Sequence, residues 1–385
     1  FMKKICFLLV LLICPFAVSA LDLANNAKSG IIMEPTTNKI IFEKNSHEHL
    51  EPASMTKMMT LLLTFEAIDN GKISLDDMVH ISKVAASMGG SQMFLEENSN
   101  IRLEEIIKGV SIASANDGAV ALAEYIGGSV ENFVSMMNQK VADLGLTDTH
   151  FANPHGLHAD NHYSSAYDMA IIAANLISHE KILQYTSIYE DYFNKPDGSR
   201  TWLVNTNKLT RYYDGVDGLK TGYTKEAGYC LTATAKKNNI RYITVVMGEP
   251  SSDLRSSETT NMLNYAFNSF KLNTIISKSQ ELGNIYIDKS KEKTAKIVAK
   301  KDITELISKE KDSPNYTYNL KIDKLNAPIK AGTKIGTIEI IDNEGLIVRE
   351  EEITIESDIT KSSFIKMVFE NFLTIIRGKK VNKIV

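Results

Sequence analysis

Hydrophobic and polar positions follow a strand-like alternation near both ends of the first two thirds of the chain. Apolar stretches at 30–33 and 39–42 flank a polar segment that contains a proline, which predicts a β-hairpin closed by a turn. Strand patterns return at 228–235 and 241–247, joined by a polar turn. We therefore expect one sheet assembled from both ends of this region, with a helical cluster beside it.

Between these strands the apolar positions recur at helical spacing. The run from Ser54 to about Asp69 contains no glycine or proline and closes at Asn70-Gly71, a typical helix stop. Its apolar positions leave little polar face, so we expect this helix to be central and buried. Further helices are predicted at 102–112, 117–125, 130–144 and 165–178.

Beyond about Asn273 the pattern changes to short alternating segments separated by charged turns. These segments lie at 285–287, 295–298, 316–322 and 337–341. The change predicts a larger domain over 21–273, followed by a separate small β domain over 274–358.

The segment 359–385 is amphipathic when drawn as a helix. Apolar residues from Phe364 to Ile376 gather mostly on one side, and basic residues such as Lys366 and Arg377 lie toward the other side and the end. Such a helix can lie in the plane of an anionic membrane surface. The same amphipathicity would serve a helix docked on a domain or at a dimer interface, so composition alone leaves both interpretations open.

The first twenty residues have the layout of a secretory signal. Lys3 and Lys4 precede an apolar run over 5–18 and small residues that end at Ala20, after which we expect cleavage. A lipoprotein signal centred on Cys14 fits less well because a bulky isoleucine precedes it. A retained membrane anchor is a further alternative, although the apolar run is short for a full span.

Composition and charge narrow the possible functions. The chain has 385 residues and 43% hydrophobic content, which is ordinary for a globular protein of two domains. Removal of the signal would lower the formal charge from -4 to -6, which argues against a nucleic-acid partner. It would also leave Cys230 as the one cysteine, in an apolar strand-like run, where we expect an inert buried thiol and no disulfide.

Ser54-Met55-Thr56-Lys57 places a hydroxyl and an amine three residues apart at the start of a predicted helix, so both project from one face. A serine needs a neighbouring base to become a nucleophile. Lysine can be that base when burial and nearby positive charge lower its pKa. The motif alone is weak evidence, because a capping serine followed by a surface lysine has the same spacing.

Two further motifs follow in order. Ser114-Ala115-Asn116 lies between two predicted helices and supplies a hydroxyl and an amide. Lys220-Thr221-Gly222 heads a strand-like segment and supplies a cation, a hydroxyl and a glycine that leaves room for substrate. Together the three motifs are the signature of serine β-lactamases and penicillin-binding proteins.

The sequence around these motifs closely resembles the D-alanyl-D-alanine carboxypeptidases among the low-molecular-mass penicillin-binding proteins. The similarity covers most of residues 25–270, including the segments 51–60, 114–119, 153–157, 163–170 and 216–224. The resemblance implies the mixed α/β (α+β) fold of DD-peptidases and serine β-lactamases, with a small C-terminal β-sandwich-like domain. It also implies that the amphipathic tail holds the enzyme to the outer, periplasmic face of the cytoplasmic membrane.

The resemblance also implies a role for each motif residue in removing the terminal D-alanine from peptides that end in D-Ala-D-Ala. Ser54 would be acylated, with Lys57 as its general base, while Ser114 and Asn116 relay protons and position the peptide. Lys220 and Thr221 would bind the terminal carboxylate next to Gly222, and the backbone N–H groups of Ser54 and Tyr223 would form the oxyanion hole. β-Lactams would be covalent inhibitors, and no metal or other cofactor is implied.

Two residues depart from the pattern of this family. Tyr223 stands where well-known members have histidine directly after Lys-Thr-Gly, so only a backbone contribution is expected from it and the role of its side chain stays open. Thr206 stands where some members have an arginine, so an ion pair with Asp168 is not expected.

Several alternatives stay open from the sequence. His155, His158 and His162 suggest a metal cluster by composition, but no carboxylate or cysteine pattern accompanies them, so we expect no metal. A β-lactamase would share the three motifs, but no Glu-x-x-Leu-Asn segment supplies a deacylating glutamate. An endopeptidase that cleaves cell-wall crosslinks, or an idle peptidoglycan-binding morphology protein, could also retain this fold.

Overall fold

The computed structural model describes residues 23–363 except 196, together with 365, 368 and 372. The signal predicted at 1–20 and most of the amphipathic segment predicted at 359–385 therefore lie outside the described residues. Within the described part of the chain, no helix combines the length and the hydropathy needed to cross a membrane.

A five-stranded antiparallel sheet forms the centre of the N-terminal part, in the order β2-β1-β9-β8-β7. Its strands are β1 (Ser29–Glu34), β2 (Lys39–Lys44), β7 (Val216–Thr224), β8 (Gly228–Lys237) and β9 (Ile240–Glu249). β1 pairs directly with β9, with Gly30 opposite Val246. This confirms the prediction of one sheet assembled from both ends of the region.

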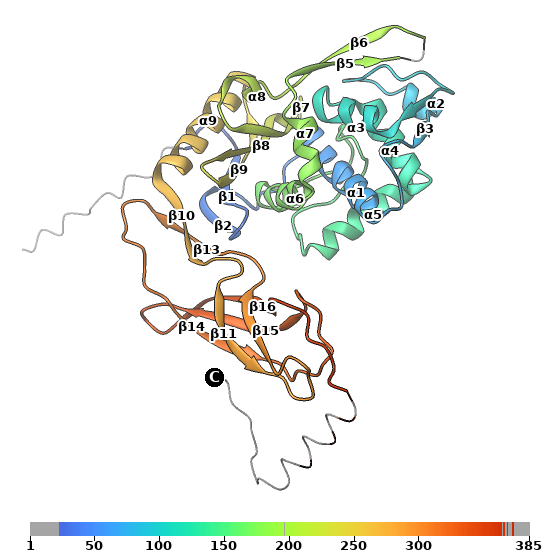
Figure 1. Ribbon diagram of the computed structural model, residues 1–385. Coiled ribbons are helices and arrows are strands. Elements are labelled where there is room, and N and C mark those ends of the chain that lie inside the picture. The colour runs from blue at the N-terminus through green and yellow to red at the C-terminus, as the bar shows by residue number, and fades with distance from the viewer. Residues whose placement is uncertain (1–22, 196, 364, 366–367, 369–371, 373–385) are drawn as a thin grey trace, which may run out of the picture.

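Side chains from successive residues of the central strands enter two different cores. Ile31 and Met33 of β1 pack with the helical cluster on one face, and Ile32 packs with α9 (Ser252–Ser269) on the other. This division follows from the two-residue period of a strand. The sheet is therefore covered on both faces, as Figure 1 shows for α9 on one side and α6 on the other.

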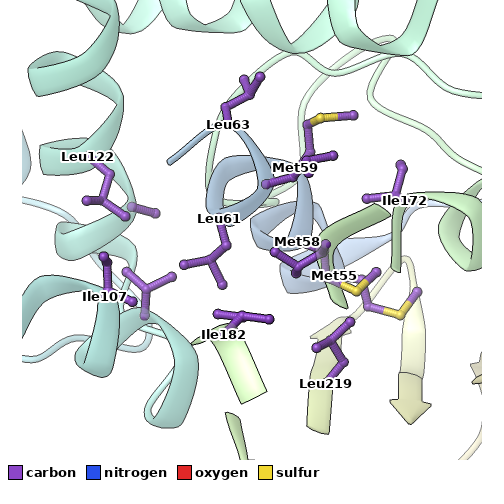
Figure 2. Close-up of a cluster of buried hydrophobic side chains, with 14 of the residues drawn as sticks. Met55, Met58, Met59, Leu61, Leu63, Ile107, Leu122, Ile172, Ile182 and Leu219 are labelled. Carbon is purple, nitrogen blue, oxygen red and sulfur yellow. The ribbon is translucent and has the colours of Figure 1, made fainter. Parts of the chain in front are cut away.

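α1 (Lys57–Asp69) is the central helix of the cluster. Ten of its thirteen residues are buried, as its lack of a polar face predicts. In Figure 2 its Leu61 lies toward Ile107 and Leu122, which belong to two neighbouring helices, and Met55 and Met58 lie near Leu219 of the sheet. The remaining helices are α2 (Lys83–Ala86), α3 (Leu103–Ile112), α4 (Asn116–Gly127), α5 (Val130–Asp143), α6 (Ala166–Ser178), α7 (Leu183–Thr186) and α8 (Leu209–Tyr212).

The sequence did not predict α9, two small strand pairs or the one-turn helices α2, α7 and α8, because few of their residues are apolar and buried. α9 buries only Met262, Leu263 and Ala266 among its apolar residues, so its helical period is weak. A projecting hairpin of β5 (Glu190–Asn194) and β6 (Arg200–Val204) buries only Phe193 and Leu203. A second small pair, β3 (Met78–His80) and β4 (Asn100–Arg102), is three residues long on each side.

The C-terminal part is rich in β-structure, as expected. Its main sheet has the order β11-β12-β16-β15-β14, and the pair β10-β13 lies between this sheet and the N-terminal part (Figure 1). Leu306 of β13 packs with α9, whereas Ile303 of the same strand packs in the C-terminal core. The strands are β10 (Phe270–Ile276), β11 (Glu281–Tyr286), β12 (Thr294–Ala299), β13 (Ile303–Ser308), β14 (Thr317–Ile322), β15 (Lys334–Ile341) and β16 (Ile347–Ile355).

Candidate active site

Ser54 lies in a short 3-10 turn directly before α1. The turn η1 spans Ala53–Thr56, and Lys57 is the first residue of α1, so the α-helix begins three residues later than predicted. In a 3-10 turn residues i and i+3 are eclipsed. The Lys57 Nζ consequently lies 2.9 Å from the Ser54 Oγ, and the nucleophile candidate and its candidate base are in hydrogen-bond contact.

The Lys57 amine is fully buried and has three polar neighbours. Besides Ser54 Oγ, it contacts the Asn116 Oδ1 at 2.7 Å and the His155 carbonyl oxygen at 2.6 Å. Burial, followed by the positive charge of Lys220, holds the Lys57 pKa well below its usual range, and the Asp117 carboxylate opposes this shift in part. A neutral amine has two N–H groups for the two carbonyl oxygens, which leaves its lone pair for the Ser54 hydroxyl.

The second motif lies in the connection between α3 and α4. Ser114 is buried there in a left-handed conformation with φ of 61°, a conformation that non-glycine residues adopt mainly where surrounding structure imposes it. Asn116 is the first residue of α4, and its Nδ2 donates to the Gly89 carbonyl at 2.7 Å. This second bond fixes the orientation of the amide that faces Lys57.

Asp117 fixes the loop that follows Gly89. Its carboxylate accepts the backbone N–H groups of Met93 at 3.1 Å and of Leu95 at 3.0 Å. No role for this residue was predicted from the sequence. Its contacts connect the second motif to a loop beside the site.

The third motif lies in the middle of β7, because this strand begins at Val216 rather than at Lys220. The Lys220 side chain is buried, and burial followed by the positive charge of Arg255 lowers its pKa to about 7. The Thr221 Oγ1 donates to the Thr206 Oγ1 at 2.7 Å. Thr206 therefore contacts the third motif instead of an acidic partner.

Gly222 allows β7 to approach the nucleophile turn. A Cβ at this position would lie 2.6 Å from the Pro52 carbonyl oxygen and 3.3 Å from the Ser54 backbone nitrogen. A larger residue would push the strand away from the turn. Glycine is thus required for the close approach of the first and third motifs.

The Tyr223 side chain points away from the buried residues of the three motifs. It is 56% exposed and lies against the Tyr229 ring of the neighbouring strand, with 4.3 Å between ring centroids. The residue that departs from the family pattern therefore contributes an exposed aromatic surface at the end of the site.

The loop at 153–157 supplies a contact to Lys57 that was not predicted from the sequence. The Asn153 Oδ1 accepts the backbone N–H groups of His155 at 3.2 Å and Gly156 at 2.6 Å, and this turn directs the His155 carbonyl to Lys57. The Pro154 carbonyl accepts the Thr60 hydroxyl at 2.6 Å. An asparagine followed by proline and glycine is a turn signal, but its backbone acceptor could not be assigned from residue types.

Arg255 is a further residue whose role was not predicted from the sequence. It is buried in the first turns of α9, and its charge helps to lower the Lys220 pKa. Ser251 caps this helix and Asp253 lies in its first turn, so an N-terminal helix signal was present in the sequence. The proximity of Arg255 to Lys220, however, depends on the sheet and could not be inferred from spacing.

Asp168 and Cys230 have structural contacts. The Asp168 carboxylate accepts the Asp148 backbone N–H at 2.9 Å and the Thr149 hydroxyl at 2.7 Å. Cys230 is buried, and burial raises the pKa of its thiol to about 11, which agrees with the expectation of an unreactive cysteine.

The three histidines considered as a metal cluster have separate partners. The His155 Nδ1 accepts the Leu157 N–H, His158 pairs with Glu51 at 2.7 Å, and His162 contacts Thr56. Among the described residues, one group brings three possible ligand atoms within 4.8 Å of one another, and it consists of Glu51, His158 and Glu226. Only one of the three histidines thus belongs to such a group.

Two family models match the chain and together cover most of it. A model described as D-alanyl-D-alanine carboxypeptidase matches residues 16–251. A model described as penicillin-binding protein 5, C-terminal domain, matches residues 270–361. The first match ends directly before α9, and the second begins directly after it, where the β-rich part of the structure starts.

Curated relatives and solved structures agree with these matches. The D-alanyl-D-alanine carboxypeptidase DacF of Bacillus subtilis is 44% identical over 345 residues, which are 89% of this chain and 88% of that protein. DacD of Escherichia coli is 33% identical over 344 residues, 86% and 87% of the two chains. The crystal structure of penicillin binding protein 5 from Haemophilus influenzae aligns with a TM-score of 0.72 and 33% identity, over 89% of this chain and 100% of the other. The expected DD-peptidase fold with a β-rich C-terminal domain is thereby confirmed.

Proposed function

The chain belongs to the D-alanyl-D-alanine carboxypeptidase family of serine peptidases, and from this premise we propose that it removes the terminal D-alanine from cell-wall peptides through an acyl-enzyme on Ser54. The proposal rests mainly on one observation, the contact of a buried Lys57 amine of lowered pKa with the Ser54 hydroxyl at 2.9 Å. This arrangement is what a serine nucleophile needs in the absence of a histidine.

In the proposed first step, Lys57 takes the proton of the Ser54 hydroxyl as its oxygen attacks the carbonyl carbon of the penultimate D-alanine. The backbone N–H groups of Ser54 and Tyr223 stabilise the oxyanion that forms. The close packing of Gly222 against the Ser54 nitrogen supports this pairing of the turn with β7. Collapse of the intermediate breaks the peptide bond, and the leaving amine receives a proton by way of Lys57 and Ser114.

The terminal carboxylate of the peptide is bound by Lys220 and Thr221. A buried cation and a hydroxyl at adjacent positions match the charge and the hydrogen-bonding capacity of a carboxylate. Arg255 adds positive charge behind them, and a bound carboxylate would raise the lowered pKa of Lys220. Asn116 positions the peptide beside Lys57.

Water then hydrolyses the acyl-enzyme and restores the Ser54 hydroxyl. β-Lactams inhibit by acylating the same serine, because their strained amide resembles the D-Ala-D-Ala peptide bond. The carboxylate of the β-lactam corresponds to the terminal carboxylate of the peptide. Acylation of this kind is a general property of the family to which the chain belongs.

We further propose that the enzyme is exported and acts at the periplasmic face of the cytoplasmic membrane, with a role in cell shape. The support is the signal layout at 1–20 and the amphipathic pattern at 359–385. Export would place the enzyme where its peptidoglycan substrate lies.

Labelling with a fluorescent penicillin tests the nucleophile. We expect the purified protein to be labelled covalently and the Ser54→Ala variant to remain unlabelled. The circular-dichroism spectrum of the variant should match that of the wild type, which shows that the variant is folded. Failure of the folded wild-type protein to become labelled would favour the idle peptidoglycan-binding interpretation.

Incubation with two substrates tests the reaction. A soluble pentapeptide that ends in D-Ala-D-Ala should release free D-alanine, and a crosslinked muropeptide dimer should remain intact. Cleavage of the dimer at a comparable rate would show an endopeptidase instead.

Deletion from Ser362 tests the membrane attachment. The shortened protein should move from the membrane to the soluble fraction, while its penicillin labelling stays the same. Membrane association that survives the deletion would refute attachment through this segment.

A further inference from the structure

His162 lies outside the three motifs but contacts the turn that carries Ser54. It is 4% exposed, and its Nε2 lies 2.8 Å from the Thr56 Oγ1, on the residue directly before Lys57. Its Nδ1 accepts the Ala152 backbone N–H at 2.9 Å, and its ring packs against Phe151. Both ring nitrogens of this buried side chain thus have a partner.

The Ala152 contact determines which ring nitrogen carries the proton. A backbone N–H can only donate, so the Nδ1 of His162 must be the acceptor. In the neutral ring the proton is then on Nε2, which donates it to Thr56. Burial, followed by the charges of His150 and His158, lowers the His162 pKa to about 4, so the ring is neutral at ordinary pH.

Residues 150–164, which include His162, lie over the nucleophile turn. We call this segment the strap. At one end Leu50 and Ser164 exchange two backbone hydrogen bonds of 2.9 Å. Further along, His162 binds Thr56, and the His155 carbonyl binds the Lys57 amine. The strap therefore holds one of the two carbonyl oxygens that orient the Lys57 amine.

Gly156 shows how closely the strap follows the turn. A Cβ there would lie 1.9 Å from the Ala53 carbonyl oxygen and 2.9 Å from the Thr56 Oγ1. The His162 side chain binds this same Thr56 oxygen. A shift of the strap at this point would separate the His155 carbonyl from Lys57.

We propose that His162 is a positioning residue that, through Thr56, keeps the strap in register with the Ser54 turn so that the Lys57 lone pair stays directed at the Ser54 hydroxyl. The inference rests on the proposed acylation of Ser54 by a D-Ala-D-Ala peptide. It assigns no contact between His162 and the substrate.

Two conservative variants separate the two hydrogen bonds of His162. The amide nitrogen of glutamine can occupy the place of Nε2, so His162→Gln keeps a donor for Thr56. The amide oxygen of asparagine can occupy the place of Nδ1, so His162→Asn keeps only the acceptor for Ala152. We expect His162→Asn to lower the second-order rate constant of penicillin acylation by about 10- to 100-fold, and His162→Gln to stay within about threefold of the wild type.

The pH dependence of acylation provides a readout that lowered stability alone would not change. Acylation needs the neutral Lys57 amine, so its rate falls as the pH drops through the Lys57 pKa. Entry of water beside the amine should raise that pKa toward its ordinary range, because burial is the largest cause of the lowered value and outweighs the loss of the His155 carbonyl as an acceptor. In His162→Asn the midpoint of the acidic limb should therefore move to higher pH, and in His162→Gln it should stay in place.

Thr56→Val tests the other end of the same contact. If the contact acts as proposed, the double variant Thr56→Val/His162→Asn should be acylated by penicillin no more slowly than the slower of the two single variants. His179→Ala is the control, because His179 binds Asp69 at the far end of α1 and should leave both rate and midpoint unchanged.

The outcomes distinguish this inference from the proposed function. An unlabelled wild-type protein would refute the acylation of Ser54. A labelled wild-type protein, with both variants at similar rates and unchanged midpoints, would refute the positioning role of His162 and leave the acylation intact.

Discussion

The N-terminal part and the C-terminal sheet are both built around buried side chains, but the two interiors differ in chemistry. The C-terminal core is dominated by isoleucine, with Ile335, Ile338, Ile340 and Ile353 fully buried, and Glu339 is the one ionisable side chain buried among the described residues of this part. The N-terminal part also buries ionisable side chains, among them Lys57, Asp117, Asp168, Lys220 and Arg255.

This difference shows which part of the interior serves stability and which serves reactivity. Aliphatic burial stabilises a fold with no electrostatic cost. Burial of a charge costs free energy unless the charge is paired, and it shifts the pKa of the group. In the N-terminal part that cost produces the lowered pKa of Lys57, which the proposed reaction needs.

The largest expected effect comes from replacing the buried base. Lys57→Gln should slow penicillin acylation by roughly 10³-fold because Ser54 loses its proton acceptor. The melting temperature should stay the same or rise, because the unfolded chain no longer gains free energy by protonating a side chain that the folded protein keeps at a lowered pKa. Stopped-flow acylation and calorimetry measure the two effects. A drop of several degrees in melting temperature would contradict the inference that burial of the Lys57 amine costs free energy.

A cavity in the C-terminal core should lower stability and leave the acylation rate unchanged, which is the reverse of the result expected for Lys57→Gln. Ile338→Ala should lower the free energy of unfolding of this sheet by about 2–5 kcal/mol, because the side chain is fully buried. The acylation rate of the N-terminal part should remain within about twofold. Ile347→Ala is the matched control, because this side chain is 56% exposed and its loss should cost less than about 0.5 kcal/mol.

The pair of Glu249 and Glu258 gives the N-terminal part a pH-dependent stability. Burial, then the hydrogen bond and charge of Glu258, raise the Glu249 pKa to about 8. At Glu258 burial acts to raise the pKa. Hydrogen bonds from Glu249 and Asn26 act in the other direction, and the Glu258 pKa is lowered overall. Between the ordinary Glu249 pKa of 4.5 and about 8, the folded protein therefore keeps a proton that the unfolded chain releases.

Stability should accordingly fall as the pH rises through this window, by up to about 1.4 kcal/mol per pH unit. Urea unfolding of the N-terminal part at several pH values between 5 and 8 measures this slope. Glu249→Gln should flatten it, whereas a slope that persists in Glu249→Gln would show that another group is responsible.

The smallest expected effect concerns Thr206. Thr206→Val removes the acceptor of the Thr221 hydroxyl, a loss of about 1 kcal/mol, and should raise the KM for the peptide about fivefold. Thr206→Ser keeps the hydroxyl and should behave as the wild type. Equal KM values in the two variants would show that the 2.7 Å contact does not position Thr221 for the substrate.

Features that depend on neighbouring residues could be predicted from the sequence, and features that depend on distant ones could not. The hairpin of β1 and β2, the buried helix after Ser54 and the connection around Ser114 follow from local apolar periods and turn residues. The 3-10 geometry of the Ser54 turn and the start of β7 at Val216 were missed, because tertiary packing sets such boundaries.

The same distinction applies to the site. The three motifs identified Ser54, Lys57 and Asn116, which the structure brings into contact. The His155 carbonyl is a backbone atom, and Arg255 reaches Lys220 only through the packing of α9 on the sheet. Neither could be inferred from residue types and spacing.

The pairing of β1 with β9 has a consequence for how the protein forms. Gly30 emerges early in synthesis, yet its partner Val246 follows only after every helix of the cluster. Contacts between residues so far apart in sequence slow the search for the native state, because a long loop must close before they form. A ribosome-bound chain that stops before β9 would therefore expose an unpaired sheet edge, a segment suited to recognition by chaperones.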